Sequence, residues 1–281
     1  MDLICNMAKN NSIVDSAVLV STYNWPEVLT LSVRSIFQQT ILPREIVIAD
    51  DGSKDPTREA IEKLKLECPD GVTIKHVWHE DRGFRAAAIR NKALAQVESP
   101  YLIQIDGDCI MERHFIQDHL AVAREGYFIA GSRVNLPKEY SEVLLSTTSF
   151  STNLISVPFS HKLNSLRVPL LRDFLASRYH INNLWWVRGA NMSFFMKDIR
   201  MVNGYNESFE GWGHEDNELS FRLLNSGVHK RALKFGGVLY HVYHEERSRA
   251  NVEHLRNLAY EVYVKGIKRT ENGLDNCQTR R

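Results

Sequence analysis

Two acidic residues one position apart, Asp106 and Asp108, follow the apolar run of residues 101–105. Side chains alternate along a strand, so positions i and i+2 point to the same side. Two aligned carboxylates repel each other unless a cation lies between them, and hard oxygen ligands of this kind suit Mg²⁺ or Mn²⁺. Because Gly107 separates them and Asp-Gly is also common in hairpin turns, a solvated acidic turn stays open as the alternative.

A second acidic pair, Glu215 and Asp216, follows the glycine-containing segment 211–214. Glycines there let the backbone approach a ligand closely, and Trp212 offers an apolar face for a ligand ring. The two acids begin a predicted helix that ends near residue 225. In the alternative interpretation they only complement the dipole of that helix.

His241 and His244 follow an apolar run that begins at residue 238. Histidine is a common metal ligand. Because the two are three positions apart, they are not expected to point the same way on a regular strand. A structural role for a histidine after a strand stays open as the alternative.

The elements that must position these residues alternate through the first half of the chain. Strands are predicted at 17–22, 45–49, 72–78 and 101–105, and helices at 26–39, 57–67 and 85–97. This alternation is typical of βαβ units in a parallel sheet, whose right-handed crossovers place the strand C-termini on one side. The polar strand ends 21–24, 50–51 and 106–108 are therefore predicted to share one rim, where ligands bind in open α/β sheets.

The second half of the chain lacks this regular alternation of strands and helices. A strand is predicted at 128–134, an irregular stretch with Pro158 and Pro169 at 138–182, and a helix at 252–268 before a polar tail that is predicted to be frayed. The predicted division is a first half with alternating strands and helices at 15–135, an irregular basic amphipathic insertion at 136–182, a second half at 183–250, and a C-terminal helix and tail at 251–281.

Residues 161–180 are basic and amphipathic. Leucines and a phenylalanine recur at roughly helical spacing, and Asp173 is the one acid among the basic residues Lys162, Arg167, Arg172 and Arg178. Such a segment can lie on an anionic membrane surface. The alternative is a packed helix with a solvated polar face.

The overall composition is that of a globular protein, with 281 residues, 43% hydrophobic and 25% charged. A net charge of +1 gives no global attraction to nucleic acid. The four scattered cysteines form no C-x-x-C pair, which argues against a disulfide framework or a zinc site and favours a cytoplasmic setting. No signal peptide is recognised at residues 1–15, and no run approaches the ~18 apolar residues of a membrane span.

Several motifs, taken in order, resemble those of a known family. They are Val20-Ser21-Thr22-Tyr23-Asn24, Ile48-Ala49-Asp50-Asp51-Gly52-Ser53, Ile105-Asp106-Gly107-Asp108, Arg188-Gly189-Ala190-Asn191 and Gly211-Trp212-Gly213-His214-Glu215-Asp216. The first three resemble family 2 glycosyltransferases, and the last two resemble the C-terminal half of galactosyltransferase-type enzymes. The resemblance covers roughly residues 15–250, and it implies that 15–135 is a nucleotide-sugar-binding half and 183–250 an acceptor-binding and catalytic half. It implies an α/β GT-A fold: a Rossmann-like, mostly parallel central sheet flanked by helices, with a C-terminal acceptor-side subdomain.

The resemblance also implies a set of residues that bind a UDP-sugar. Asp50 would read uracil, with Ser21 to Tyr23 shaping the base pocket, and Arg85 and Arg90 would lie nearest the nucleotide. From residue types alone, Asp50 can equally be a turn aspartate before a glycine, and the arginines can equally be surface residues. The implied donor-binding residues are Ser21, Thr22, Tyr23, Asp50, Arg85, Arg90, Asp106, Gly107, Asp108, Asn191 and Trp212.

For the metal and the chemistry, the resemblance implies that Asp108 ligates Mn²⁺ or Mg²⁺ directly, with His241 as a further ligand. His244 would contact the diphosphate instead. The pair Glu215 and Asp216 would be catalytic, with Asp216 as the general base that takes a proton from the acceptor hydroxyl. His214 stands where glycine is commoner, which leaves sugar selectivity open.

The predicted function is a metal-dependent inverting glycosyltransferase that moves a hexose or N-acetylhexosamine from a UDP-sugar to a saccharide or lipid-linked saccharide. A role in bacterial capsule or lipopolysaccharide synthesis is expected, in the cytoplasm or peripherally at the inner membrane. One alternative, a nucleotidyltransferase, would carry a loop with Gly and Lys after the first strand, and residues 21–26 contain neither. A non-catalytic carbohydrate-binding module of the same fold is the other alternative.

Overall fold

The computed structural model describes residues 14–147, 162–245 and 251–278 of the chain. Three parts of the predicted division therefore lie partly outside the described residues. These parts are 148–161 of the insertion, with Pro158, then 246–250 of the acceptor half, and the end of the tail at 279–281.

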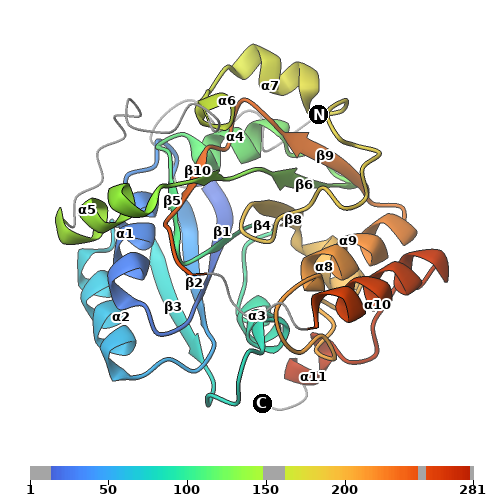
Figure 1. Cartoon of the computed structure of the whole chain (residues 1–281), viewed down its shortest axis with the longest axis horizontal. Helices are drawn as coiled ribbons and strands as arrows, with labels where there is room; N and C mark the ends of the chain where they lie inside the picture. The colour runs from blue at the N-terminus through green and yellow to red at the C-terminus, as the bar shows by residue number, and fades with distance from the viewer. Residues whose placement is uncertain (1–13, 148–161, 246–250, 279–281) are drawn as a thin grey trace.

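In the described part of the chain, the central sheet has seven strands. They are β1 (Val14–Thr22), β2 (Pro43–Asp50), β3 (Thr73–Trp78), β4 (Tyr101–Asp106), β6 (Tyr127–Gly131), β8 (Met192–Phe195) and β9 (His229–Leu233). Their spatial order is β3-β2-β1-β4-β8-β6-β9 (Figure 1). All neighbours are parallel except β8, which runs antiparallel to both β4 and β6. This confirms the predicted α/β fold with a mostly parallel central sheet.

Helices cover both faces of this sheet (Figure 1). They are α1 (Pro26–Phe37), α2 (Asp55–Glu67), α3 (Ala86–Leu94), α4 (Phe115–Val122), α5 (Lys138–Thr147), α6 (Lys162–Ser165), α7 (Pro169–Leu175), α8 (Met196–Met201), α9 (Glu215–Asn225), α10 (Val252–Val264) and α11 (Asp275–Gln278). The predicted helices in the first half and those at 215–225 and 252–268 are confirmed within a few residues at their ends.

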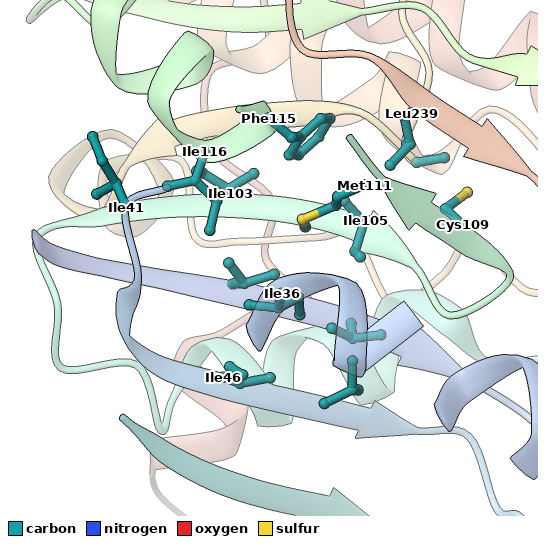
Figure 2. Packing of buried hydrophobic residues seen from close by; sticks show 14 of the residues in the cluster. Ile36, Ile41, Ile46, Ile103, Ile105, Cys109, Met111, Phe115, Ile116 and Leu239 are labelled. Atoms are coloured by element: carbon teal, nitrogen blue, oxygen red, sulfur yellow. The ribbon is translucent and has the colours of Figure 1, made fainter. Parts of the chain in front are cut away.

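The alternation of side chains along β1, β2 and β4 builds a core on each face. In parallel register, Val18 lies beside Ile46 and Ile103, and this row packs with α1, α2 and α4. Figure 2 shows this face, with Ile36 of α1 beside the sheet and Ile105 further along β4. The intervening residues pack on the opposite face with α3, α8 and α9. Strands buried on both faces read as continuous apolar runs, which is why they are recognisable in the sequence.

A second, three-stranded sheet in the described chain joins β5 (Cys109–Met111), β10 (Leu239–His241) and β7 (Val134–Asn135). β10 pairs antiparallel with β5, so that His241 lies opposite Cys109. Residues distant in the sequence are thereby brought beside the end of β4.

Several predictions for the second half are wrong. The stretch 138–182, predicted to be irregular, contains helices α5, α6 and α7 in its described part, and the predicted strand 128–134 is divided into β6 and β7. The tail is not frayed as far as residue 278, because Leu274 is buried and its N–H donates to the Asn203 carbonyl. Five further elements, β5, β8, β9, α4 and α8, were not predicted from the sequence.

Candidate active site

The polar ends of β1, β2 and β4 lie side by side, as predicted. In the parallel register Ser21 lies beside Asp106, and Thr22 beside Asp50. The N–H of Gly107 donates to the Ser21 carbonyl over 2.7 Å. A Cβ at position 107 would lie 2.9 Å from that oxygen, so this close approach requires glycine.

Arg90 of α3 links these strand ends to helix α9. Its side chain is almost fully buried, and its Nε donates to the Ser21 hydroxyl over 3.1 Å. The two terminal nitrogens bond to Asp106 at 3.2 Å and to Glu215 at 3.0 Å. The surface-arginine alternative is therefore wrong for Arg90. One guanidinium instead holds together the metal-motif strand and the predicted catalytic helix.

The carboxylate of Asp216 is held from three sides. Its Oδ1 accepts from the Tyr205 hydroxyl at 2.9 Å, from the Gln104 amide at 3.4 Å and from Arg90 at 3.5 Å. Glu215 is more deeply buried, whereas part of the Asp216 side chain reaches solvent. Of the two acids, Asp216 is thus the more accessible to solvent.

Glu218, the third acid of the first turn of α9, has a different environment. It pairs with Arg222 at 2.6 Å, and both side chains are buried. The dipole alternative does not account for these acids as a group, because Glu215 and Asp216 interact with side chains on other elements.

Burial and the neighbouring Asp216 raise the pKa of Glu215 to about 7, although Arg90 opposes the shift. An acid whose pKa is raised by folding contributes stability at low pH. That contribution is complete below its ordinary value of 4.5 and is lost as the pH rises through about 7.

We therefore expect the wild-type chain to lose on the order of 3 kcal/mol of unfolding free energy between pH ~4.5 and ~7 through this group. Glu215→Gln keeps an acceptor for Arg90 without the charge, and it should lose correspondingly less. Urea unfolding of both proteins at pH 5 and pH 8 measures the difference. Equal losses in the two proteins would contradict the assignment.

Asp108, His241 and His244 form a cluster at the opposite end of the site. Oδ2 of Asp108 lies 3.5 Å from Nε2 of His241 and 3.3 Å from Nε2 of His244, and one ligand atom from each of the three lies within 4.8 Å of the others. The expectation that the histidines could not face the same way is wrong, because β10 ends at His241 and the chain then leaves the strand.

The donor set fits a divalent cation. It combines one carboxylate oxygen, a ligand type that suits Mn²⁺ and Mg²⁺, with two imidazole nitrogens, which are common metal ligands. Burial opposes ionisation of Asp108, but hydrogen bonds from His241 and His244 outweigh it and lower the pKa of the Asp108 carboxyl. Asp106 points instead to Arg90, so the two aspartates have different partners.

The residues of the predicted base pocket differ in burial and in their contacts. Asp50 is buried, and its oxygens contact the Ser53 N–H at 2.8 Å and the His76 ring at 2.9 Å. This is the turn interaction that the alternative predicts, and uracil recognition by Asp50 stays a prediction. Tyr23 is partly exposed at the rim and donates to Asp81 at 2.9 Å.

The remaining predicted donor-binding residues differ in exposure. Trp212 is 41% exposed in the loop before α9, where a ligand can contact its ring. The Arg85 guanidinium donates to the Glu80 carbonyl at 2.7 Å, close to the surface pairing that the alternative predicts. Asn191 is fully buried, and its side chain bonds to His119 and to two backbone carbonyls. Asn191 thus belongs to the framework, away from any surface that a nucleotide could touch.

Sequence reasoning missed two residues that contact Asp216, namely Gln104 and Tyr205. Gln104 is a polar residue inside an otherwise apolar strand, and this was the one available signal. Gly189, within a recognised motif, has a specific role as well. A Cβ there would lie 2.0 Å from Oδ2 of Asp216, so only glycine leaves room for the carboxylate.

Two family models match the chain. Residues 17–172 match the glycosyl transferase family 2 model, and residues 173–245 match the model described as the N-terminal domain of galactosyltransferase. The change from one model to the other falls inside the predicted insertion 136–182.

Characterised relatives include the validoxylamine A glucosyltransferase of Streptomyces hygroscopicus subsp. limoneus, 30% identical over 75% of this chain and 48% of that protein. The chondroitin synthase of Escherichia coli is 25% identical over 80% of this chain and 34% of that protein. The chain thus spans about half or less of the length of these relatives.

Solved structures share the fold at low sequence identity. S. aureus TarS 1-349 in complex with UDP-GlcNAc has a TM-score of 0.61 at 17% identity, covering 94% of this chain and 69% of that one. The mannosyltransferase PcManGT of Pyrobaculum calidifontis, with GDP-Man and Mn²⁺, has a TM-score of 0.58 at 16% identity, covering 94% and 68%. The motif resemblance is confirmed: the chain belongs to glycosyl transferase family 2, with the GT-A fold and a galactosyltransferase-type second half.

Proposed function

We propose that this chain transfers a hexose or N-acetylhexosamine from a UDP-sugar to a hydroxyl group of an acceptor, with inversion at the anomeric carbon. The observation that carries the proposal is a single site with two chemical ends. The metal-ligand cluster around Asp108 lies at one end and the partly exposed carboxylate of Asp216 at the other, and Arg90 connects Asp216 to the strand that leads into the cluster.

Each end would perform one part of the transfer. Asp108, His241 and His244 would hold Mn²⁺ or Mg²⁺, and a cation bound there neutralises charge on the departing diphosphate. Asp216 takes the proton of the acceptor hydroxyl, whose oxygen forms a bond to the anomeric carbon. The bond from that carbon to the UDP oxygen breaks on the opposite side, so the configuration inverts without a covalent intermediate.

The comparisons support the choice of substrates. A fold neighbour binds UDP-GlcNAc, and another binds GDP-Man with Mn²⁺. Relatives include chondroitin synthases and a glucosyltransferase. We therefore propose a saccharide or lipid-linked saccharide acceptor and a role in bacterial cell-surface polysaccharide synthesis. The UDP-binding roles of Ser21, Thr22, Tyr23, Asp50 and the other predicted donor-binding residues, apart from the buried Asn191, belong to the same proposal.

Calorimetric titration of the chain with UDP tests the nucleotide half of this proposal. We expect UDP to bind more tightly with Mn²⁺ than with EDTA, and more tightly than GDP. Binding that is indifferent to both Mn²⁺ and the base would contradict it. Release of pyrophosphate from a nucleoside triphosphate and a sugar phosphate would favour the nucleotidyltransferase alternative.

We also propose that α6 and α7 contact an anionic membrane surface from the cytoplasmic side. The orientation of the segment favours this proposal over the packed-helix alternative, because Arg167 and Arg172 point inward and several apolar side chains point outward. Arg167 and Arg172 bond to the buried Asp118 of α4, whereas Leu170 is 84% and Phe174 57% exposed. In Figure 1, α6 and α7 lie at the periphery, beyond α4.

Basic residues lie beside the exposed apolar side chains of this surface. Arg178 lies over the Phe174 ring, and Lys234 bonds to Asn164 of α6. Lipids offer both an apolar layer and anionic headgroups to such a surface. Among the described helices, none has the length and apolarity needed to cross a bilayer, so the contact that we propose is peripheral.

Replacing Leu170, Leu171 and Phe174 together by serine should abolish flotation with vesicles that contain anionic lipid, because these side chains supply the apolar contact. The matched control is Leu66→Ser, which replaces an equally exposed leucine on α2. Charge removal at Arg167 or Arg172 is unsuitable, since it takes away one of the two arginine partners of the buried Asp118. Unchanged flotation of the triple variant would refute membrane contact through this surface.

A further inference from the structure

We propose that Tyr205 and Gln104 are positioning residues that orient the carboxylate of Asp216 toward the acceptor hydroxyl. The inference rests on the proposed function, since it assumes that Asp216 is the general base. Within the described part of the chain, neither residue hydrogen-bonds to Asp108, His241 or His244. Both would act through Asp216 alone.

The contacts form a closed network beneath the base. The Tyr205 hydroxyl lies 2.9 Å from Oδ1 of Asp216 and 2.8 Å from Oε1 of Gln104. The Gln104 amide nitrogen donates to the Gly189 carbonyl at 2.9 Å and points to Oδ1 of Asp216 at 3.4 Å. Tyr205 and Gln104 are both fully buried, so water cannot substitute for these bonds.

The two carboxylate oxygens of Asp216 have different surroundings. Within the described residues, every hydrogen bond to this carboxylate goes to Oδ1. Oδ2 lies against Gly189, where a Cβ would approach it to 2.0 Å. Oδ1 is thus held by protein donors, and Oδ2 is the oxygen left to take the proton.

The Tyr205 hydroxyl has one proton and two neighbouring acceptors, Oδ1 of Asp216 and Oε1 of Gln104. It can therefore donate a hydrogen bond whether Asp216 is ionised or protonated. While Asp216 is an anion, the charged oxygen is the stronger acceptor, and Tyr205 donates to it. When Oδ2 has taken the proton of the acceptor hydroxyl, the phenol proton can rotate to Oε1 of Gln104. No buried donor is then left unpaired in either state, which avoids the cost of an unsatisfied polar group.

Other charged groups around Asp216 do not replace this network. Arg90 approaches Oδ1 of Asp216 only at 3.5 Å, because its guanidinium also donates hydrogen bonds to Glu215 and Asp106. Burial and the neighbouring Asp216 raise the pKa of the Tyr205 phenol well above its ordinary value. The phenol therefore keeps its proton and acts as a donor.

Tyr205→Phe removes the hydroxyl and leaves the packed ring in place. We expect kcat to fall about 10- to 100-fold, since misplacement of a catalytic group by ~1 Å costs up to about that factor. The KM for the UDP-sugar and the affinity for UDP with Mn²⁺ should stay within about twofold of the wild type. Gln104→Met should give a smaller loss, and the double variant should lose less than the product of the two single effects.

The matched control is Tyr101→Phe. Tyr101 is a buried tyrosine on the same strand as Gln104, and its hydroxyl bonds to Ser193 at 2.7 Å, away from the site. This variant should lose comparable thermal stability but keep its kcat. A kcat of Tyr205→Phe equal to that of Tyr101→Phe would overturn the inference. A parallel loss of UDP affinity in Tyr205→Phe would also overturn it.

The inactive-base variant Asp216→Asn separates this inference from the proposed function. If Asp216→Asn is inactive and Tyr205→Phe is fully active, only the positioning role fails. If Asp216→Asn keeps wild-type kcat, the assignment of the base fails, and the positioning role falls with it.

Discussion

Asp216→Asn should lower kcat by about 10³-fold, within the range that general acid–base catalysis contributes. The amide has nearly the same shape as the carboxylate, and it can still accept the Tyr205 hydrogen bond at Oδ1. It cannot take a proton from the acceptor hydroxyl. Binding of UDP with Mn²⁺ should therefore be unchanged, and the loss should appear in kcat rather than in KM for the donor.

The control for this variant is Glu210→Gln, which neutralises an exposed acid in the loop before α9. It should keep full activity, because a solvated charge at that position contributes little. Initial rates of UDP formation at saturating donor measure both proteins. A kcat of Asp216→Asn close to that of Glu210→Gln would exclude Asp216 as the base.

Asp108→Asn should weaken cation binding by the cluster of Asp108, His241 and His244. The change replaces the charged member of the cluster by a neutral amide, while His241 and His244 keep their places. A cation supplies several kcal/mol of charge stabilisation to such a transition state, which corresponds to a loss of about 10²–10³-fold in kcat/KM. Wild-type protein in EDTA should fall to the same level.

Direct titration with Mn²⁺ checks the cause of this loss. We expect Asp108→Asn to bind Mn²⁺ much more weakly than the wild type. Asp70→Asn, a change at an exposed aspartate in the loop between α2 and β3, should bind it normally. Mn²⁺-stimulated activity that survives in Asp108→Asn would show that the cluster is not the metal site.

The first half of the fold was predictable because its signals are local. Buried parallel strands read as short apolar runs, and each ends in polar residues such as Ser21 or Asp106. Once the strands are parallel, their C-termini must share one rim. A shared rim for Ser21 and Asp106 therefore followed from the order of elements, whereas the pairing of β1 with β4, which places them side by side, came from the structure.

The histidine ligands depend on a contact that no local pattern encodes. His241 and His244 reach Asp108 because β10 pairs with β5, directly after the acidic motif. The periodicity of a regular strand allowed only one of them to do so. The end of the strand at His241 releases the second from that constraint.

The residues that hydrogen-bond to Asp216 were equally difficult to predict from the sequence. Tyr205 precedes the Gly-Trp-Gly segment by only a few residues, but its hydroxyl meets Gln104 inside the sheet. A buried phenol and a buried amide carry no periodic signature. Their role depends on how β4 and α9 are placed relative to each other in the folded chain.

The insertion shows how one buried charge can reverse an amphipathic pattern. The spacing of its leucines indicated a helix with an apolar face, and the usual expectation is that this face packs inward. Asp118 lies fully buried beneath it and binds Arg167 and Arg172. Because a buried carboxylate requires such partners, the arginines point inward and Leu170 and Phe174 point outward.

The most direct test of the central claim is the formation of UDP from UDP-hexoses and UDP-N-acetylhexosamines by the purified chain, with saccharide acceptors and with Mn²⁺ or EDTA. We predict that at least one donor gives UDP in the presence of Mn²⁺, and that EDTA and Asp216→Asn each lower the rate of its formation by about 10²- to 10³-fold. Absence of both UDP binding and UDP release across all donors and acceptors with Mn²⁺ would contradict the account.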